Sequence, residues 1–193
     1  MNNSLSITEM KSGLASLLAV KSYKEGDFTL ASGKKSDYYF DCRQTALHPE
    51  GSYLLGNIFL SMIREMDAPV HGVAGMTLGA DPLVSAVTIV SYLEGVSLPG
   101  MLVRKKAKGY GTDSYLEGTA NFRPGASICM LEDVITTGAS VVKACERVNN
   151  AGYEVKYILC VLDRDEGGRI ELEKRGYKSY SIFRREDLAN APV

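Results

Sequence analysis

The segment from residue 128 to 140, ICMLEDVITTGAS, constrains the fold of this chain more than any other part of the sequence. Four apolar residues lead into two adjacent carboxylates, Glu132 and Asp133, and small hydroxyl residues with a glycine follow two further apolar residues. A helical pattern of apolar residues then begins at Val141. This order predicts a buried strand, a loop and the N-terminus of a helix, which together form a unit of α/β folds.

The loop of this unit combines an anion site with two acids. The unpaired N–H groups and the positive dipole end of a helix N-terminus favour a bound phosphate. Open α/β sheets bind ligands at the carboxyl ends of their strands, which is where Glu132 and Asp133 are expected. We therefore expect a ligand that carries a phosphate together with hydroxyl groups or a metal. The alternative is a purely structural joint, in which the acids are solvated and the threonines cap the helix.

Strand and helix patterns alternate along most of the chain, which predicts an α/β fold with an open, mainly parallel sheet flanked by helices on both faces. The expected strands are Val70–Ala74, Met101–Arg104, Ser127–Leu131, Val155–Leu162 and Tyr180–Phe183. The expected helices are one that starts at Pro49 and the segments Pro82–Leu93, Val141–Asn150 and Gly168–Arg175. With 193 residues, the chain is long enough for one such domain with a full core.

The N-terminal part is expected to differ from this alternating core. Ser6 and Glu9 have the spacing of a capping box at the start of a helix. Two short strands, Phe28–Ser32 and Tyr38–Cys42, are expected to form a hairpin. We expect residues 1–193 to form a single domain, with a core from about residue 46 to 180. The first 45 residues or so and the C-terminal segment would form a small hood over the carboxyl edge of the sheet.

The bulk composition argues against several classes of protein. The formal net charge of -1 provides no overall basic field for a nucleic-acid or membrane partner. The sequence has no cleavable N-terminal signal and no apolar run of about 18 residues, which predicts a cytoplasmic protein. The 4 cysteines form no C-x-x-C pair and are expected to be buried, reduced thiols. The only histidines, His48 and His71, lie in different contexts, which argues against a histidine-rich metal site.

A dense basic cluster interrupts this balanced charge. Arg104, Lys105, Lys106 and Lys108 lie close together, and two glycines flank Tyr110 directly after them. The glycines oppose a stable helix, so we expect a mobile, positively charged arm. Such an arm can neutralise negative charge on a phosphate ligand and exclude water when it closes. Taken alone, the cluster is more typical of a solvated basic loop or a nucleic-acid patch, but its position after a strand of a phosphate-binding fold favours the arm.

The segment from residue 128 to 140 resembles the phosphoribosyl-diphosphate motif of the type I phosphoribosyltransferases. The resemblance implies the fold of that family, with its small N-terminal hood. It also implies that Glu132 and Asp133 hold the ribose hydroxyls of phosphoribosyl diphosphate. The loop residues implied to wrap the 5′-phosphate are Thr136, Thr137, Gly138, Ala139 and Ser140.

The basic cluster narrows the resemblance to one branch of that family. Its pattern, Arg-Lys-x-x-Lys-x-x-Gly, is similar to the catalytic loop of the orotate phosphoribosyltransferases. The resemblance implies that Arg104, Lys105 and Lys108 contact the diphosphate. It also includes Tyr110 among the contacts to phosphoribosyl diphosphate, at a position where many members have histidine. In the family this loop reaches into the neighbouring subunit's site, which implies a homodimer with shared active sites.

The segment from residue 28 to 40, FTLASGKKSDYYF, resembles the Phe-Thr-Leu-x-Ser-Gly element of the same family. The resemblance implies that Tyr39 and Phe40 stack on or near the pyrimidine. Some members have lysine where this chain has Ala31, so one phosphate contact is missing or comes from elsewhere. The alternative is a hairpin with ordinary strand aromatics.

Two further segments are similar to the family. The sequence Leu-Asp-Arg that ends at Arg164 implies that Arg164 binds the carboxylate of orotate and that Asp163 holds Arg164 in place. Thr136 is expected to contact orotate as well as phosphoribosyl diphosphate. The loop from residue 75 to 82 is implied to touch the diphosphate through its backbone, since Gly79 stands where some members have lysine. The structural alternative for Arg164 is a salt-bridged turn.

These segments run from about residue 28 to 168 in the family's order and imply a pentosyltransferase of pyrimidine (UMP) biosynthesis. The implied reaction transfers the phosphoribosyl group to orotate and yields orotidine 5′-monophosphate and diphosphate. Its cofactor, Mg²⁺, would be held mainly by substrate and water, with no direct protein ligand. The implied catalytic residues are Lys105, Lys108, Glu132 and Asp133. The alternatives are a phosphoribosyltransferase for a purine or uracil, although a purine has no carboxylate to pair with Arg164, and a non-catalytic regulator with the same fold.

Overall fold

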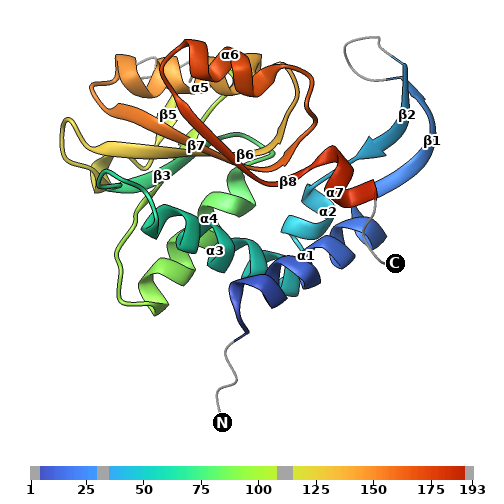
Figure 1. Ribbon diagram of the computed structural model, residues 1–193. Helices are drawn as coiled ribbons and strands as arrows, with labels where there is room; N and C mark the ends of the chain where they lie inside the picture. The colour runs from blue at the N-terminus through green and yellow to red at the C-terminus, as the bar shows by residue number, and fades with distance from the viewer. Residues whose placement is uncertain (1–4, 30–34, 108–114, 190–193) are drawn as a thin grey trace.

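The computed structural model describes residues 5–29, 35–107 and 115–189, and its centre is a six-stranded sheet with the order β5-β4-β3-β6-β7-β8 (Figure 1). The strands are β3 (Gly72–Met76), β4 (Gly100–Val103), β5 (Leu116–Glu117), β6 (Ser127–Ile135), β7 (Glu154–Asp163) and β8 (Lys178–Arg184). All neighbouring pairs are parallel except β4 and β5, which are antiparallel. The expected open, mainly parallel sheet is therefore confirmed.

Helices cover both faces of the sheet (Figure 1). One face carries α3 (Pro49–Arg64) and α4 (Asp81–Leu93), and the other carries α5 (Ala139–Asn150) and α6 (Gly168–Lys174). Successive residues of β6 point to opposite faces, so that Cys129 and Leu131 join one apolar cluster and Ile128 and Met130 join the other. Burial on both faces explains why this strand reads as a continuous apolar run.

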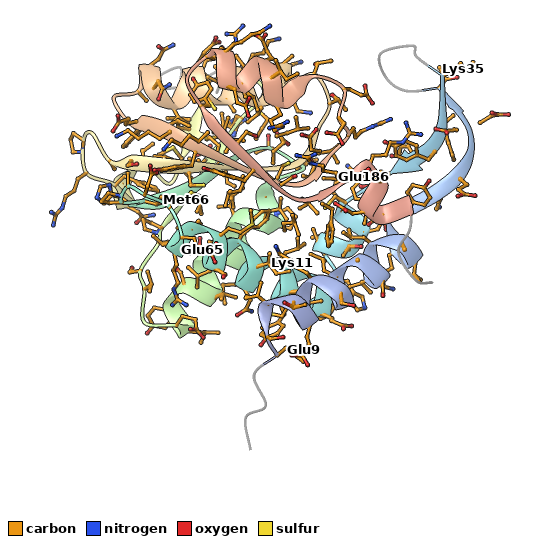
Figure 2. The ribbon with its side chains drawn as sticks, viewed as in Figure 1. Glu9, Lys11, Lys35, Glu65, Met66 and Glu186 are labelled. Carbon is orange, nitrogen blue, oxygen red and sulfur yellow. The ribbon has the colours of Figure 1, made fainter. Side chains whose placement is uncertain are left out.

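The N-terminal part contains α1 (Ile7–Lys21), the hairpin strands β1 (Tyr23–Thr29) and β2 (Lys35–Phe40), and the short helix α2 (Arg43–Ala46). The capping box of α1 is confirmed, because the N–H of Glu9 donates to Ser6 Oγ and the N–H of Ser6 donates to Glu9 Oε2. Figure 2 shows Glu9 at the start of this helix. Leu14 and Leu18 of α1 are fully buried in the same apolar cluster as residues of α3. The division of the chain into a hood and a core stays a prediction.

The hairpin strands differ from their expected bounds. The first strand begins at Tyr23, which pairs with Phe40, and not at Phe28; a bulge interrupts the pairing between Glu25 and Phe28. Its polar, exposed residues give no apolar alternation, which is why the expected start was wrong. The second strand ends at Phe40, because the carboxylate of Asp41 accepts the N–H of Arg43 at the start of α2. Residues 30–34, at the expected turn, lie outside the described residues.

Strand β6 continues beyond its expected end. It runs four residues past Leu131 because it stays paired with β7, with Glu132 opposite Cys160 and Ile135 opposite Asp163. Glu132 and Asp133 therefore lie near the end of β6, within the part that pairs with β7, and not in the loop after the strand. Strand β5 and the helices α2 and α7 (Arg185–Ala189) are too short to have a periodic sequence signal.

All four cysteines are free and buried, as expected. Within residues 5–29, 35–107 and 115–189, no helix combines the length and the apolar character that a membrane span requires.

Candidate active site

A pocket of about 470 Å³ lies at the carboxyl edge of the sheet, between the hairpin and the ends of β3, β4 and β6. It is lined by Tyr39, Phe40, Asp41, Arg43, Met76, Thr77, Leu78, Gly79, Lys105, Glu132, Asp133, Val134 and Ser140. Aromatic side chains of the hairpin, a cation of the basic cluster and both acids of β6 thus border one space. Its size is ordinary for a small-molecule site.

The two acids at the base of the pocket differ in their surroundings. The side chain of Glu132 is buried, and its Oε2 has no hydrogen-bond partner among the described residues. Burial, with the nearby charge of Asp133 as a second cause, raises the pKa of Glu132 well above its usual range. Asp133 is half-buried and its Oδ1 accepts the N–H of Val134 at 2.9 Å. Two adjacent carboxyl groups at the base of the pocket can hydrogen-bond to the hydroxyl groups of a ligand.

Gly79 and Asp133 pack directly against each other, although Gly79 lies on the loop after β3 and Asp133 lies on β6. A Cβ atom at Gly79 would lie 2.5 Å from Asp133 Oδ2 and 2.8 Å from Asp133 Oδ1. No side chain fits at residue 79 while the carboxylate keeps its place. The glycine therefore fixes where the charge of Asp133 sits in the pocket.

The loop from Thr136 to Ser140 surrounds a small cavity of about 60 Å³ at the start of α5. Gly138, with φ of 79°, precedes the helix, and the first helical bond runs from Val142 N–H to Gly138 O. The N–H groups between these residues therefore have no partner within the helix and can bind an anion. Gly168 secures the loop, because its N–H donates to Thr136 O at 2.9 Å and a Cβ there would lie only 2.4 Å from that oxygen.

Arg164 lies beside the hairpin, outside the set of residues that line the 470 Å³ pocket. Its Nε is 2.9 Å from Glu166 Oε1, and its guanidinium lies 4.6 Å from the centre of the Tyr38 ring. Asp163, which was expected to hold Arg164, accepts the N–H of Asp165 at 2.9 Å. Glu166 is an ion-pair partner of Arg164, and the role of Asp163 in holding Arg164 stays a prediction.

The basic cluster is divided in the structure. Lys105 lines the pocket, whereas Arg104 Nη1 pairs with Glu117 Oε1 at 3.2 Å, on strand β5. Lys108 and Tyr110, both expected to contact phosphoribosyl diphosphate, lie outside the described residues.

Comparison with known proteins identifies the family. No protein-family model matches the chain. The curated orotate phosphoribosyltransferase of Thermosynechococcus vestitus is 44% identical over 184 residues, which cover 95% of this chain and 95% of that protein. That of Nostoc sp. is 42% identical over 182 residues, covering 94% of this chain and 86% of the relative. The chain belongs to the orotate phosphoribosyltransferase family.

Solved structures of the orotate phosphoribosyltransferase family share the fold. The Mycobacterium tuberculosis orotate phosphoribosyltransferase in complex with 5-phospho-alpha-D-ribosyl 1-diphosphate has a TM-score of 0.77 and 30% identity, over 93% of this chain and 99% of that chain. The resemblance inferred from the sequence motifs is thus confirmed at the level of family and fold. The roles of individual residues stay predictions.

The structure brings together many of the residues that the family resemblance implied. Those that line the pocket are Tyr39, Phe40, Lys105, Glu132, Asp133 and Ser140. Those that line the adjoining small cavity include Thr136, Thr137, Gly138 and Ala139, with Glu132 and Ser140 common to both. Arg104 and Arg164 lie outside both sets.

Sequence reasoning missed two charged residues of the pocket, Asp41 and Arg43. They form an ion pair with Arg43 Nε 2.8 Å from Asp41 Oδ1, and this contact is the leading cause of the lowered pKa of Asp41. Their position directly after the aromatic pair of the hairpin was the available signal, because a chain that leaves a site-forming strand keeps its next residues near the site.

Replacing Gly79 by alanine is expected to lower kcat by roughly 100-fold, because the new methyl group displaces the carboxylate of Asp133. A misplacement of a catalytic group by about 1 Å can cost that much in rate. Only the end of a short side chain has to move, so the melting temperature should change little. Steady-state kinetics and thermal unfolding of the variant check this. Full activity, or a loss of activity that follows a loss of folding, would contradict it.

Proposed function

We propose that this chain transfers the phosphoribosyl group of 5-phosphoribosyl-1-diphosphate to orotate, giving orotidine 5′-monophosphate and diphosphate in pyrimidine (UMP) synthesis. Membership of the orotate phosphoribosyltransferase family makes it a pentosyltransferase. The observation that carries the assignment is the pocket in which the two acids, Lys105 and the hairpin aromatics meet beside the anion-binding loop.

The acids and the loop would hold the phosphoribosyl group. Backbone N–H groups at the start of α5, with Thr136, Thr137 and Ser140, would bind the 5′-phosphate. Glu132 and Asp133 would bind the ribose hydroxyls. As the anomeric C–O bond breaks, positive charge grows on the ribose ring, and the fixed negative charge of Asp133 stabilises it without reorganisation.

Cations would act on the leaving diphosphate. Lys105 borders the pocket, and Arg104, Lys108 and Tyr110 are proposed as further contacts. Among the residues that the structure describes, no group of three or more histidine, cysteine, aspartate and glutamate side chains is placed to hold a metal ion. Two carboxylates in an open pocket fit a Mg²⁺ ion that would be held mainly by substrate and water and would supply positive charge to the diphosphate.

The hairpin and Arg164 would select the base. Tyr39 and Phe40 border the pocket and would stack on the pyrimidine, with Thr136 as a further contact. The guanidinium of Arg164 would bind the carboxylate of orotate. Since Arg164 pairs with Glu166 in the structure, the substrate must compete with an internal carboxylate for this guanidinium.

The identity of the product tests this assignment. The protein is incubated with phosphoribosyl diphosphate, Mg²⁺ and equal amounts of orotate, uracil, hypoxanthine and adenine, and the nucleotides are analysed by mass spectrometry. Orotidine 5′-monophosphate is the expected product. A purine nucleotide or uridine monophosphate would point to the alternative phosphoribosyltransferases. No product, with salt-sensitive binding to duplex DNA, would favour a regulator.

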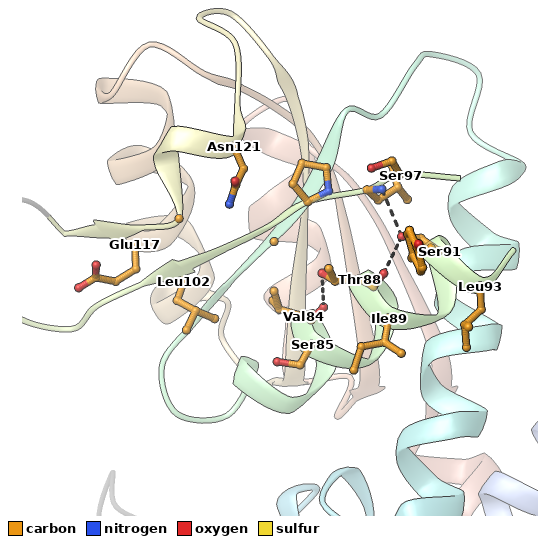
Figure 3. A pocket seen from close by; sticks show the side chains of 15 residues that line it. Val84, Ser85, Thr88, Ile89, Ser91, Leu93, Ser97, Leu102, Glu117 and Asn121 are labelled. Atoms are coloured by element: carbon orange, nitrogen blue, oxygen red, sulfur yellow. Dashed lines mark hydrogen bonds between the residues drawn. The ribbon is translucent and has the colours of Figure 1, made fainter. Parts of the chain in front are cut away.

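We also propose a homodimer, formed through an apolar groove of about 790 Å³ along α4 (Figure 3). Ile89, Tyr92 and Leu93 form a helical stripe on α4 and are 61%, 79% and 75% exposed. Figure 3 shows Ile89 and Leu93 on α4, with Glu117 across the groove. Because Glu117 closely follows the basic cluster, a second copy docked here would lie next to that cluster, which supports shared active sites.

Replacing Leu93 by glutamate is expected to raise the dimer dissociation constant by at least about 100-fold, because an unpaired charge would be buried at the interface. Sedimentation velocity of the wild type and the variant checks this. Ile170 on α6, 54% exposed and far from the groove in sequence, serves as the control site for the same substitution. A monomeric wild type, or a dimer untouched by Leu93→Glu, would contradict the proposal.

A cytoplasmic location is part of the same proposal. Its support is the set of four free, buried cysteines, which is typical of proteins that work in a reducing compartment.

A further inference from the structure

The guanidinium of Arg147, on α5, contacts both ends of the basic cluster's loop. Its Nη1 donates to the carbonyl oxygen of Arg104 at 2.7 Å, and its Nη2 donates to that of Lys105 at 3.3 Å. The same group lies over the ring of Tyr115, 4.2 Å from its centre. Arg104 and Lys105 precede residues 108–114 and Tyr115 follows them, so one side chain joins the two ends.

These contacts supply hydrogen-bond donors to carbonyl groups that lie beyond the end of a strand. β4 ends at Val103, so the carbonyl groups of the next residues lie beyond the regular ladder. The N–H of Arg104 donates to Tyr115 O at 2.7 Å, which closes the two ends on each other. A planar guanidinium with its donors in a rigid fork suits two adjacent carbonyls, whereas the ammonium of a lysine does not reproduce that geometry.

Lys105 is the pocket residue whose backbone these contacts hold. Its side chain borders the same pocket as Glu132 and Asp133. Burial raises the pKa of Glu132, and the charge of Lys105 acts on it in the opposite direction, which is consistent with an ammonium group near the acids. The direction in which this ammonium enters the pocket depends on where the backbone at Lys105 is fixed.

We propose that Arg147 is a positioning residue for phosphoribosyl transfer, which fixes the backbone at Lys105 so that the Lys105 ammonium meets the diphosphate. The inference rests on the proposed function of Lys105. It also gives α5 two roles, because this helix starts at the loop for the 5′-phosphate and carries Arg147 near its other end. One rigid helix would then set the distance between the groups that hold the two ends of phosphoribosyl diphosphate.

A double-mutant cycle between Arg147 and Lys105 tests the proposal. Arg147→Met is expected to lower kcat roughly 10- to 100-fold, because a misplaced catalytic group costs that much. In the Lys105→Ala background the same substitution is expected to change kcat by less than about twofold, since two residues that act as a unit are not additive. Arg147→Lys, which keeps the charge and loses the fork, should give a smaller loss that also disappears in that background.

Lys143→Met is the matched control, because Lys143 is an exposed cation one turn earlier on α5. The kcat of this variant should equal that of the wild type. Thermal unfolding is measured for every variant. If Arg147→Met does not fold, the double-mutant cycle is carried out with Arg147→Lys in its place. Equal losses of kcat in both backgrounds would overturn the positioning role alone. A kcat unchanged by Lys105→Ala would overturn the proposed function of Lys105, and the positioning role with it.

Discussion

Replacing Asp133 by asparagine is expected to lower kcat about 100-fold, because the substitution removes the fixed negative charge that faces the ribose as positive charge develops there. Asparagine keeps the volume of the side chain, and its Oδ1 can still accept the N–H of Val134, which lies 2.9 Å from the present Oδ1. The charge of Asp133 also contributes to the raised pKa of Glu132, after burial, so the substitution lowers that pKa as well. The fold should survive, since Asp133 is only half-buried.

Kinetics and thermal unfolding of Asp133→Asn are compared with those of Glu146→Gln, which neutralises an exposed carboxylate on α5. The control should match the wild type in both measurements. If Asp133→Asn lost melting temperature and activity together, the carboxylate would be a structural group and its assigned role would be wrong.

Replacing Arg164 by methionine is expected to raise the KM for orotate by about 100-fold, with a much smaller effect on the KM for phosphoribosyl diphosphate. The guanidinium is the proposed partner of the substrate's carboxylate, and Arg164→Lys should restore only part of the affinity because an ammonium cannot make the two-pronged contact. The side chain of Arg164 is only 10% exposed, so a carboxylate that reaches it exchanges water for a well-ordered ion pair.

Glu166→Gln is the informative companion of the Arg164 variants. Glu166 now pairs with Arg164 Nε at 2.9 Å, so its neutralisation should lower the KM for orotate by removing an internal competitor. Initial rates over a range of orotate concentrations check both substitutions. Equal rises in the KM for both substrates, or no change in either, would show that Arg164 does not select the base.

The sequence was sufficient for the part of the fold that regular patterns encode. The apolar run of β6, its acids and the glycine before α5 lie next to one another in the chain, so their local geometry follows from strand and helix preferences. The start and end of the hairpin strands were harder to predict, because β1 is polar and exposed and has no apolar pattern. This strand pairs through its backbone.

The candidate site contains contacts that no local pattern predicts. Gly79 meets Asp133 from a loop 54 residues away in sequence, and Arg147 reaches the carbonyl groups of Arg104 and Lys105 from another helix. The ion pair between Arg164 and Glu166 depends on which way each side chain leaves the chain after the end of β7. Such pairings are decided by tertiary packing, after the elements have formed.

The rate at which the purified protein consumes orotate tests the central claim most directly. Orotate is followed by its ultraviolet absorbance with phosphoribosyl diphosphate and Mg²⁺, and with each component omitted in turn. We expect absorbance to fall only when all components are present, and to fall about 100-fold more slowly with Asp133→Asn. No consumption of orotate by the wild type under the complete conditions, or an equal rate for the variant, would contradict the account of this pocket.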